Sequence, residues 1–245
     1  FPYLKKRVCL VIRMDSQAEI PPYLYKNREE TFSRLLFRAS PDSDIRFFQV
    51  SYNNLLIVYC MFPSRSSKEE CMQECLRTGR KLIDALGQEQ LHVEIGVSEC
   101  HSGAAAIREE FEQGLKALKL GKELHPEENL YSYQQDAIYH LLKEGLTDEK
   151  LLSFYENTVQ VLDQYDAENH SDLADTLRGY FEWNQNITTA SQKMYIHRNT
   201  LSSRLEKIKE ILGNEMNSQQ ECLILQLGLY ARTLIQIEKN AHPGL

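Results

Sequence analysis

The first half of the chain alternates short apolar runs with amphipathic segments, a pattern typical of strands that alternate with helices. The runs that predict strands are residues 7–14, 45–50, 55–62, 91–97 and 129–133. Between the first two runs, apolar residues recur at helical spacing at Phe32, Leu35, Leu36 and Ala39. The pattern predicts one twisted sheet with helices packed on it.

Local signals mark several ends of these elements. Residues 51–54 include tandem asparagines, which tolerate the positive φ angles of a tight antiparallel hairpin. Ser67 and Glu70 form a capping box, which predicts the start of a helix. We expect that helix to end at Gly87 and the helix after Ile107 to end at Gly121, because glycine is common at helix C-termini.

From Asp136 onward the strand signal disappears and helical spacing continues to the C-terminus. We expect one helix over 136–144, a second over 147–164 capped by Thr147, and a third capped by Ser171. The predicted fold class is therefore α+β: an α/β sandwich with a mixed sheet, followed by an all-α domain. The predicted divisions are residues 1–135, a helical connector over 136–170, and residues 171–245.

Residues 188–212 have the spacing of a helix-turn-helix. Thr188 is placed to cap a short helix that runs through Met194, and a three-residue turn over 195–197 leads into a longer helix. The longer helix has a buried stripe at Leu201, Leu205, Ile208 and Leu212. An ordinary helical hairpin with one polar face has the same spacing, so the pattern alone leaves both interpretations open.

The charge of this segment differs from that of the rest of the chain, whose formal net charge is -7. Residues 187–212 hold five cations and two acids, which gives 5 - 2 = +3 and leaves -7 - 3 = -10 elsewhere. A short basic island inside an acidic chain fits a compact DNA-reading element, because phosphate contacts need Lys and Arg only where the duplex lies. A solvated helix face would have the same charge.

The open side of the longer helix carries side chains that can form hydrogen bonds to base edges. We expect base readout from Arg198, Asn199 and Ser202, and phosphate contacts from polar groups of both helices. His197 either caps the longer helix, touches the DNA backbone, or is purely structural. The predicted DNA-binding residues are Thr188, Thr189, Lys193, His197, Arg198, Asn199, Thr200, Ser202, Ser203 and Arg204.

These residues also resemble a known family. Asn186-Ile187-Thr188, the run 194–201 with its His-Arg-Asn-Thr tetrapeptide, then Arg204-Leu205 and Lys207-Ile208, closely resemble the C-terminal helix-turn-helix of the PucR/CdaR regulators. Ala190-Ser191 stands where that family usually has Thr-Ala, and Ser203 where an aromatic is common. The resemblance implies a sequence-specific transcription regulator that activates nearby catabolic genes.

The first half is similar to the degenerate GGDEF-like domain found beside this helix-turn-helix, notably in residues 93–97 and 109–121. In active cyclases of that type the hairpin turn carries glycines and acids for nucleotide and metal. The equivalent stretch here, residues 51–55, holds no acid. We therefore expect no catalysis and no cofactor, and we interpret Asp15, at the end of the first strand, as a solvated turn residue. The nucleotide-binding GGDEF-type enzyme is the weaker alternative.

The six cysteines sit among apolar neighbours without CxxC pairs, so we expect reduced, buried thiols. Cys71 and Cys75 are one helical turn apart, but no nearby pair completes a metal site, and none is predicted. Adjacent residues rarely face each other productively, so the neighbouring Cys100 and His101 are not expected to act as nucleophile and base.

The expected partners are double-stranded DNA, a second copy of the chain, and a small-molecule effector bound by an N-terminal part that this sequence lacks, since it begins with Phe1 rather than Met. The helix over 218–237 has a wide apolar surface that either packs on the helix-turn-helix or forms a dimer interface. A protein-interaction module that does not bind DNA is the main alternative function. No apolar run approaches the roughly 20 residues of a membrane helix, and we expect a cytoplasmic protein without membrane contact.

Overall fold

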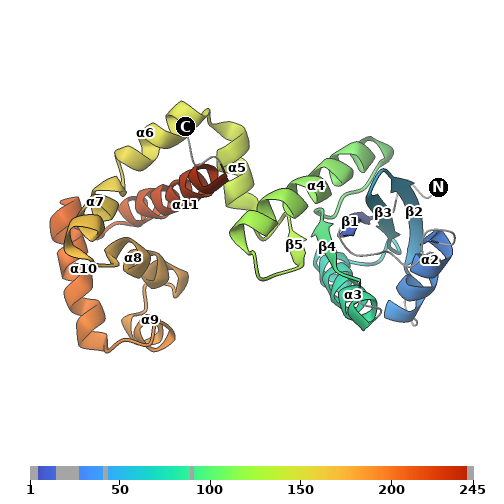
Figure 1. The fold of residues 1–245 in the computed structure, drawn as a ribbon, viewed down its shortest axis with the longest axis horizontal. Coiled ribbons are helices and arrows are strands. Elements are labelled where there is room, and N and C mark those ends of the chain that lie inside the picture. Colours follow the sequence, from blue (N-terminus) through green and yellow to red (C-terminus); the bar gives the residue numbers. More distant parts are fainter. Residues whose placement is uncertain (1–4, 15–27, 41–43, 89–90, 242–245) are drawn as a thin grey trace. The chain divides into compact units, whose positions relative to one another are not determined.

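The computed structural model describes residues 5–14, 28–40, 44–88 and 91–241. The chain divides into two compact units, Phe1–Ala137 and Ile138–Leu245 (Figure 1). Asp15 lies outside the described residues. The three-part division predicted from the sequence stays a prediction.

The first unit is built on a five-stranded sheet with the order β2-β3-β1-β4-β5. Its strands are β1 (Arg7–Met14), β2 (Arg46–Tyr52), β3 (Leu55–Met61), β4 (Val93–Val97) and β5 (Leu130–Ser132). Every neighbouring pair is antiparallel except β4 with β5, which is parallel. The sheet is mixed and all-helical structure follows it, which confirms the predicted α+β class.

The β2–β3 hairpin is antiparallel, as predicted, but its turn is shorter than expected. The ladder continues to the pair Tyr52↔Leu55, which leaves Asn53 and Asn54 as the two-residue turn. Asn53 has a φ of 52°, in the left-handed region that asparagine tolerates better than most residues. The side-chain amide of Asn54 donates to the carbonyl of Met14 at 3.3 Å and so fixes the turn against the end of β1.

Helices cover both faces of the sheet (Figure 1). They are α2 (Arg28–Ala39), α3 (Lys68–Gln88) and α4 (Ile107–Leu124), and a short 3-10 turn (Ala104–Ala106) precedes α4. Side chains alternate between the faces of a strand, so β1 contributes Leu10 and Ile12 to the core under α2 and α3. Cys9 and Val11 join Ala117 and Leu118 of α4 in the core on the opposite face.

Two of the expected helix ends are wrong. Helix α3 continues past Gly87 to Gln88, and α4 continues past Gly121 to Leu124. Gly121 is needed for packing instead, because a Cβ there would lie 2.5 Å from the side chain of Tyr131. The start of α3 is confirmed: the Ser67 amide donates to Glu70 Oε2 at 2.7 Å, and the Glu70 amide donates to Ser67 Oγ at 3.1 Å.

The second unit is all helical in the part that the structure describes. Its helices are α5 (Ala137–Gly145), α6 (Asp148–Glu156), α7 (Gln160–Asn169), α8 (Leu173–Glu182), α9 (Ile187–Lys193), α10 (Arg198–Leu212) and α11 (Gln219–Ala241). The single helix predicted over 147–164 is wrong, because α6 ends before Asn157 and Val159 is buried at the break. Thr147 caps α6 as predicted and accepts from the Lys150 amide.

The cap expected for α8 is also wrong. The carboxylate of Asp166, at the end of α7, accepts from the amides of Leu173 at 2.8 Å and Ala174 at 2.9 Å, while the hydroxyl of Ser171 donates to Asp166 Oδ1. A carboxylate at a helix N-terminus also interacts favourably with the helix dipole. Among the described helices, none is both long enough and apolar enough to cross a membrane.

Candidate nucleic-acid interface

Three helices of the second unit form a compact group in which α8 packs against both α9 and α10. The sequence permits a close approach at Gly179 on α8, where a Cβ would lie 2.8 Å from the sulfur of Met194 at the end of α9. Ala190 and Ser191, small and buried, serve the same purpose on α9. The short α9, a four-residue connection and the longer α10 are the arrangement predicted for a helix-turn-helix.

Polar side chains hold the N-termini of both helices in this motif. Asn186 caps α9, since its side-chain oxygen accepts from the Thr189 amide at 2.9 Å. The expectation that Thr188 caps this helix is therefore wrong, and Thr188 lies exposed within its first turn. His197 caps α10, because its Nδ1 accepts from the Asn199 amide at 3.2 Å.

One side of α10 is buried and the other is open. Leu201, Leu205 and Ile208 are buried, as the sequence predicts, whereas Leu212, the last residue of the predicted stripe, is half-buried. Four of the predicted DNA-contacting residues at the start of this helix are exposed, and the fifth, Ser202, is half-buried. The exposed four are Arg198, Asn199, Thr200 and Ser203. This open side therefore offers a guanidinium, an amide and hydroxyls, which can donate to and accept from base edges.

Most cations of the basic island have an acidic partner. Lys207 Nζ lies 2.9 Å from Glu210, and Lys209 Nζ lies 3.0 Å from Glu206. Arg198 and Lys193 have no ion-pair partner among the described residues. Lys193 instead lies over the ring of Trp183, with its Nζ 5.1 Å from the ring centroid. The positive charge available to a duplex is therefore concentrated at the start of α10 and the end of α9.

Arg204 is engaged inside the motif. Its Nη1 lies 3.0 Å from the carboxylate of Asp172 and donates to the hydroxyl of Thr176 at 3.1 Å. These bonds tie α10 to the first turn of α8, so Arg204 sets the position of the helix. Its predicted phosphate contact, like the other predicted DNA contacts, stays a prediction.

The turn contains a residue that the sequence reasoning did not single out. Tyr195 has a φ of 55°, and 95% of its surface is exposed. The left-handed region costs an L-residue roughly 1–2 kcal/mol, and an exposed ring returns little of that through packing. The amide of Ile196 nevertheless donates to the carbonyl of Ser191 at 3.0 Å, which holds the turn closed.

We expect Tyr195→Gly to raise the free energy of unfolding of the second unit by up to about 1 kcal/mol, because glycine adopts a positive φ without strain. Trp183 is the only tryptophan of the chain, so its fluorescence during denaturation reports on this unit. Tyr195→Ala is the matched control, since it removes the ring and keeps the strained Cβ. Equal losses of stability in both variants would show that the ring packs.

Among its described residues, the first unit offers little for nucleophilic or metal chemistry. All six cysteines of the chain, five of them in this unit, are free and buried. Burial, together with the neighbouring Cys100, raises the pKa of Cys71 to about 12, so this thiol is protonated near neutral pH. His101 Nε2 lies 3.0 Å from Gln113 Oε1. Among the described residues, no group of three or more His, Cys, Asp or Glu side chains is placed to hold a metal ion.

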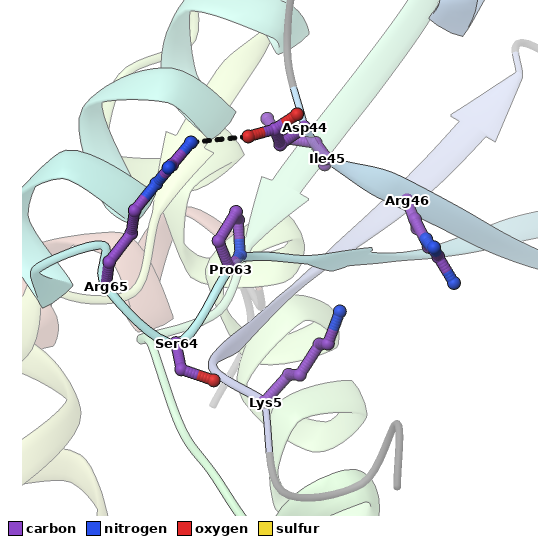
Figure 2. Close-up of a pocket in the computed structure, with 7 residues that line it drawn as sticks. All are labelled: Lys5, Asp44, Ile45, Arg46, Pro63, Ser64 and Arg65. Atoms are coloured by element: carbon purple, nitrogen blue, oxygen red, sulfur yellow. Dashed lines mark hydrogen bonds and ion pairs between the residues drawn. The ribbon is translucent and has the colours of Figure 1, made fainter.

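A hollow of about 570 Å³ lies where β1 and β2 begin and β3 ends (Figure 2). Arg65 crosses part of it to pair with Asp44 at 2.5 Å, and both side chains are exposed. Lys5 and Arg46 line the same hollow. Two cations beside a serine suit an anion, and the one carboxylate of the lining, Asp44, is engaged by Arg65.

Comparison with protein families places one part of the chain. Residues 173–231, which run from the start of α8 into α11, match the model of the PucR C-terminal helix-turn-helix domain. The match includes every residue predicted to contact DNA.

The similarity to curated relatives extends beyond this segment. The chain is 25% identical to the DNA-binding transcriptional activator AdeR of Bacillus subtilis (strain 168), over 74% of this chain and 42% of that protein. It is 30% identical to the purine catabolism regulatory protein of the same strain, over 58% of this chain and 27% of that protein. It is 26% identical to the carbohydrate diacid regulator of Escherichia coli (strain K12), over 57% of this chain and 36% of that protein. The chain thus spans less than half the length of these relatives.

Among solved structures, the chain is similar to the regulator of polyketide synthase expression from Bifidobacterium adolescentis, at 16% identity and a TM-score of 0.37. The similarity covers 94% of this chain and 81% of that one.

Proposed function

We propose that this chain, whose residues 173–231 match the model of the PucR C-terminal helix-turn-helix domain, is a DNA-binding transcription regulator that acts by binding and not by catalysis. The observation that carries the proposal is the open face at the start of α10. Arg198, Asn199 and Thr200 are exposed there, and Arg198 has no ion-pair partner among the described residues. A helix of this kind reads the major groove with the residues near its N-terminus.

Each side chain of the motif then has a distinct role. Arg198 and Asn199, with Ser202, form hydrogen bonds to base edges, for which forked and amide side chains are suited. Thr188, Thr189 and Lys193 on α9, with Thr200 and Ser203 beside the reading residues, contact phosphates or the edges of the site and fix the register. His197 holds the first turn of α10 through its cap, and Arg204 holds the helix against α8 and reaches a phosphate only if it leaves Asp172.

For the regulated genes, the proposal names only a broad class. One relative is named as a transcriptional activator and another as a regulatory protein of purine catabolism, and these names support a role in activating catabolic genes. The first unit, interpreted as a GGDEF-like domain without catalytic acids, serves dimerisation or signal relay in the cytoplasm. A small-molecule effector would act through a part of the protein outside this chain.

The test is DNA binding by fluorescence anisotropy across a salt series, with random duplex and with DNA from upstream of the gene. We expect the wild-type chain to prefer the upstream DNA with a steep salt dependence. Arg198→Ala/Asn199→Ala should lose that preference, since each good base contact contributes about 1–3 kcal/mol, or roughly 5- to 150-fold in affinity.

Arg108→Ala is the matched control, because it removes an exposed arginine from α4 in the other unit. It should leave the preference for upstream DNA unchanged. If the wild-type chain binds no duplex above background, the second unit is better interpreted as a protein-interaction module, for which the exposed Leu223 and Ile224 on α11 would be a suitable surface.

A further inference from the structure

In the part of the first unit that the structure describes, no helix covers one half of one sheet face. Cross-strand partners point to the same side, and the register pairs Phe48 with Tyr59 and Val50 with Ile57. Ile57 belongs to the core that faces α4, so Phe48 and Val50 point to that side as well. Helix α4 packs on β1, β4 and β5, and Figure 1 shows β2 at the opposite edge of the sheet.

The side chains of β2 on this face are apolar and exposed. Phe48 is 56% exposed, Val50 38% and Tyr52 58%. The ring of Phe48 lies 6.5 Å from the ring of Tyr59 on the neighbouring strand, so the apolar surface continues onto β3. A contiguous apolar patch of this kind is uncommon on a solvent-facing sheet and marks an interaction surface.

The same strand is the edge of the sheet. β2 pairs with β3 on one side, and no strand among the described residues pairs with its other side. Natural edge strands are commonly protected by lysine, proline, a bulge or short length. β2 spans seven residues, has none of those residue types, and carries its only charge at Arg46, its first residue. The residues of β2 therefore offer none of the usual protection against pairing with another strand.

The sequence of β2 fits a second copy of itself. If two copies align antiparallel about Gln49, Phe48 lies opposite Val50 of the other copy and Arg46 lies opposite Tyr52 of the other copy. This arrangement brings apolar side chains together at the centre and a guanidinium against an aromatic ring at each end. Parallel pairing in register would instead place Arg46 against itself.

Charge also favours this face as the meeting point. The chain carries a formal net charge of -7, so two copies repel each other over most of their surfaces. The exposed side chains of β2 on this face are Arg46, Phe48, Val50 and Tyr52, and none of them is an acid. Their partners on β3, which are also not acids, are Met61, Tyr59, Ile57 and Leu55; Ile57 is buried and the other three are half-buried. An uncharged patch with one cation at its end allows two acidic chains to approach.

We propose that two copies of this chain associate through β2, antiparallel about Gln49, so that the two sheets join into one. The two-fold axis makes every contact occur twice, as in most homodimers. This association does not depend on DNA. It would nevertheless supply the two-fold symmetry with which helix-turn-helix proteins read paired half-sites.

The test introduces charged side chains at Phe48 and Val50, which would face each other across the two-fold axis. In Phe48→Glu/Val50→Glu, glutamates of the two copies would lie opposite each other at both positions, and Phe48→Lys/Val50→Lys does the same with lysines. We expect multi-angle light scattering to show that the wild-type chain is a dimer. For each variant alone, the Kd of the dimer should be about tenfold higher or more. An equimolar mixture of the two variants should recover a heterodimer, because opposite charges then face each other.

Both substituted side chains are exposed, so circular dichroism should show an unchanged fold. Leu223→Glu/Ile224→Glu on α11 is the control for the rival apolar surface and should leave the dimer intact. A wild-type chain that stays monomeric, a dimer that persists in both β2 variants, or dissociation by the α11 variant alone would each overturn the proposal. Failure of the mixed variants to associate would overturn the antiparallel pairing.

Discussion

Replacing Glu110 with leucine is expected to lower the free energy of unfolding of the first unit by about 3–5 kcal/mol, because the change removes the carboxylate that a buried guanidinium binds with two nitrogens. Arg7 donates from Nε and Nη2 to the two carboxylate oxygens of Glu110, at 3.1 and 2.8 Å. The two side chains are 4% and 0% exposed. A guanidinium cannot lose its proton at any accessible pH, so its charge remains in the core without the Glu110 carboxylate.

The reverse change, Arg7→Met, should behave differently with pH. It leaves the Glu110 carboxyl buried, and burial already raises the pKa of this group against the lowering effect of Arg7. A raised carboxyl pKa means that the folded state holds its proton more tightly than the unfolded chain, so stability falls as the pH rises through that interval. We therefore expect the penalty of Arg7→Met to be smaller near pH 5 than near pH 8. The penalty of Glu110→Leu should not change in this way.

The measurement is thermal unfolding followed by far-ultraviolet circular dichroism, with Trp183 fluorescence as an internal reference for the other unit. A loss of 3–5 kcal/mol should lower the Tm of the first unit by roughly 10 °C or more. Glu112→Ala is the control on the same helix. Glu112 is 45% exposed and its partner Arg108 is 89% exposed, so this pair should contribute nothing measurable to stability. If both glutamate variants unfold at the same temperature, the buried pair is not a stability determinant.

The sequence predicts those parts of the fold that depend on local pattern. The apolar run over residues 7–14 and the reciprocal bonds of Ser67 and Glu70 need no distant partner, and the strand and the helix start that they predict were both confirmed. The helix caps show the limit of this reasoning. Ser171 and Thr188 are good capping residues, but Asp166 and Asn186, close by in the sequence, are also good caps and form the bonds instead.

Other features depend on contacts outside the local pattern. The helix end expected at Gly121 was wrong because this glycine lies against the side chain of Tyr131 on β5. The local sequence also does not show that Arg204 binds Asp172 and Thr176, about thirty residues earlier, and its predicted phosphate contact stays a prediction. The open face of α10 was predictable because the buried stripe of one helix defines its own opposite side.

Replacing Arg232 with methionine is expected to lower the free energy of unfolding of the second unit by about 2–4 kcal/mol. This residue of α11 is 9% exposed. Its guanidinium lies 2.8 Å from Asp163 on α7 and 3.0 Å from Asp175 on α8. Asp163 also accepts a hydrogen bond from the hydroxyl of Tyr155 on α6, so one cation joins four helices.

The loss of stability in Arg232→Met should come mainly from the carboxylate of Asp163, which would lose its cation. That carboxylate is 24% exposed, whereas Asp175 is 53% exposed and its pair with Arg232 is screened by solvent. Arg232→Lys should recover only part of the stability, because an ammonium cannot bind both oxygens of Asp163 and reach α8 at the same time. Arg178→Ala is the matched control, since Arg178 also pairs with Asp175, at 3.2 Å, from the exposed side of α8.

Denaturation followed by Trp183 fluorescence measures this effect, because Trp183 directly follows α8. The double variant Arg232→Met/Asp163→Leu should be more stable than Arg232→Met, since it removes the stranded carboxylate together with its partner. Below the unfolding transition the open face of α10 is intact, so we expect Arg232→Met to keep its preference for upstream DNA while it loses stability. A variant that lost DNA preference without losing stability would show that Arg232 positions α8 for reading, and that the network is not primarily a determinant of stability.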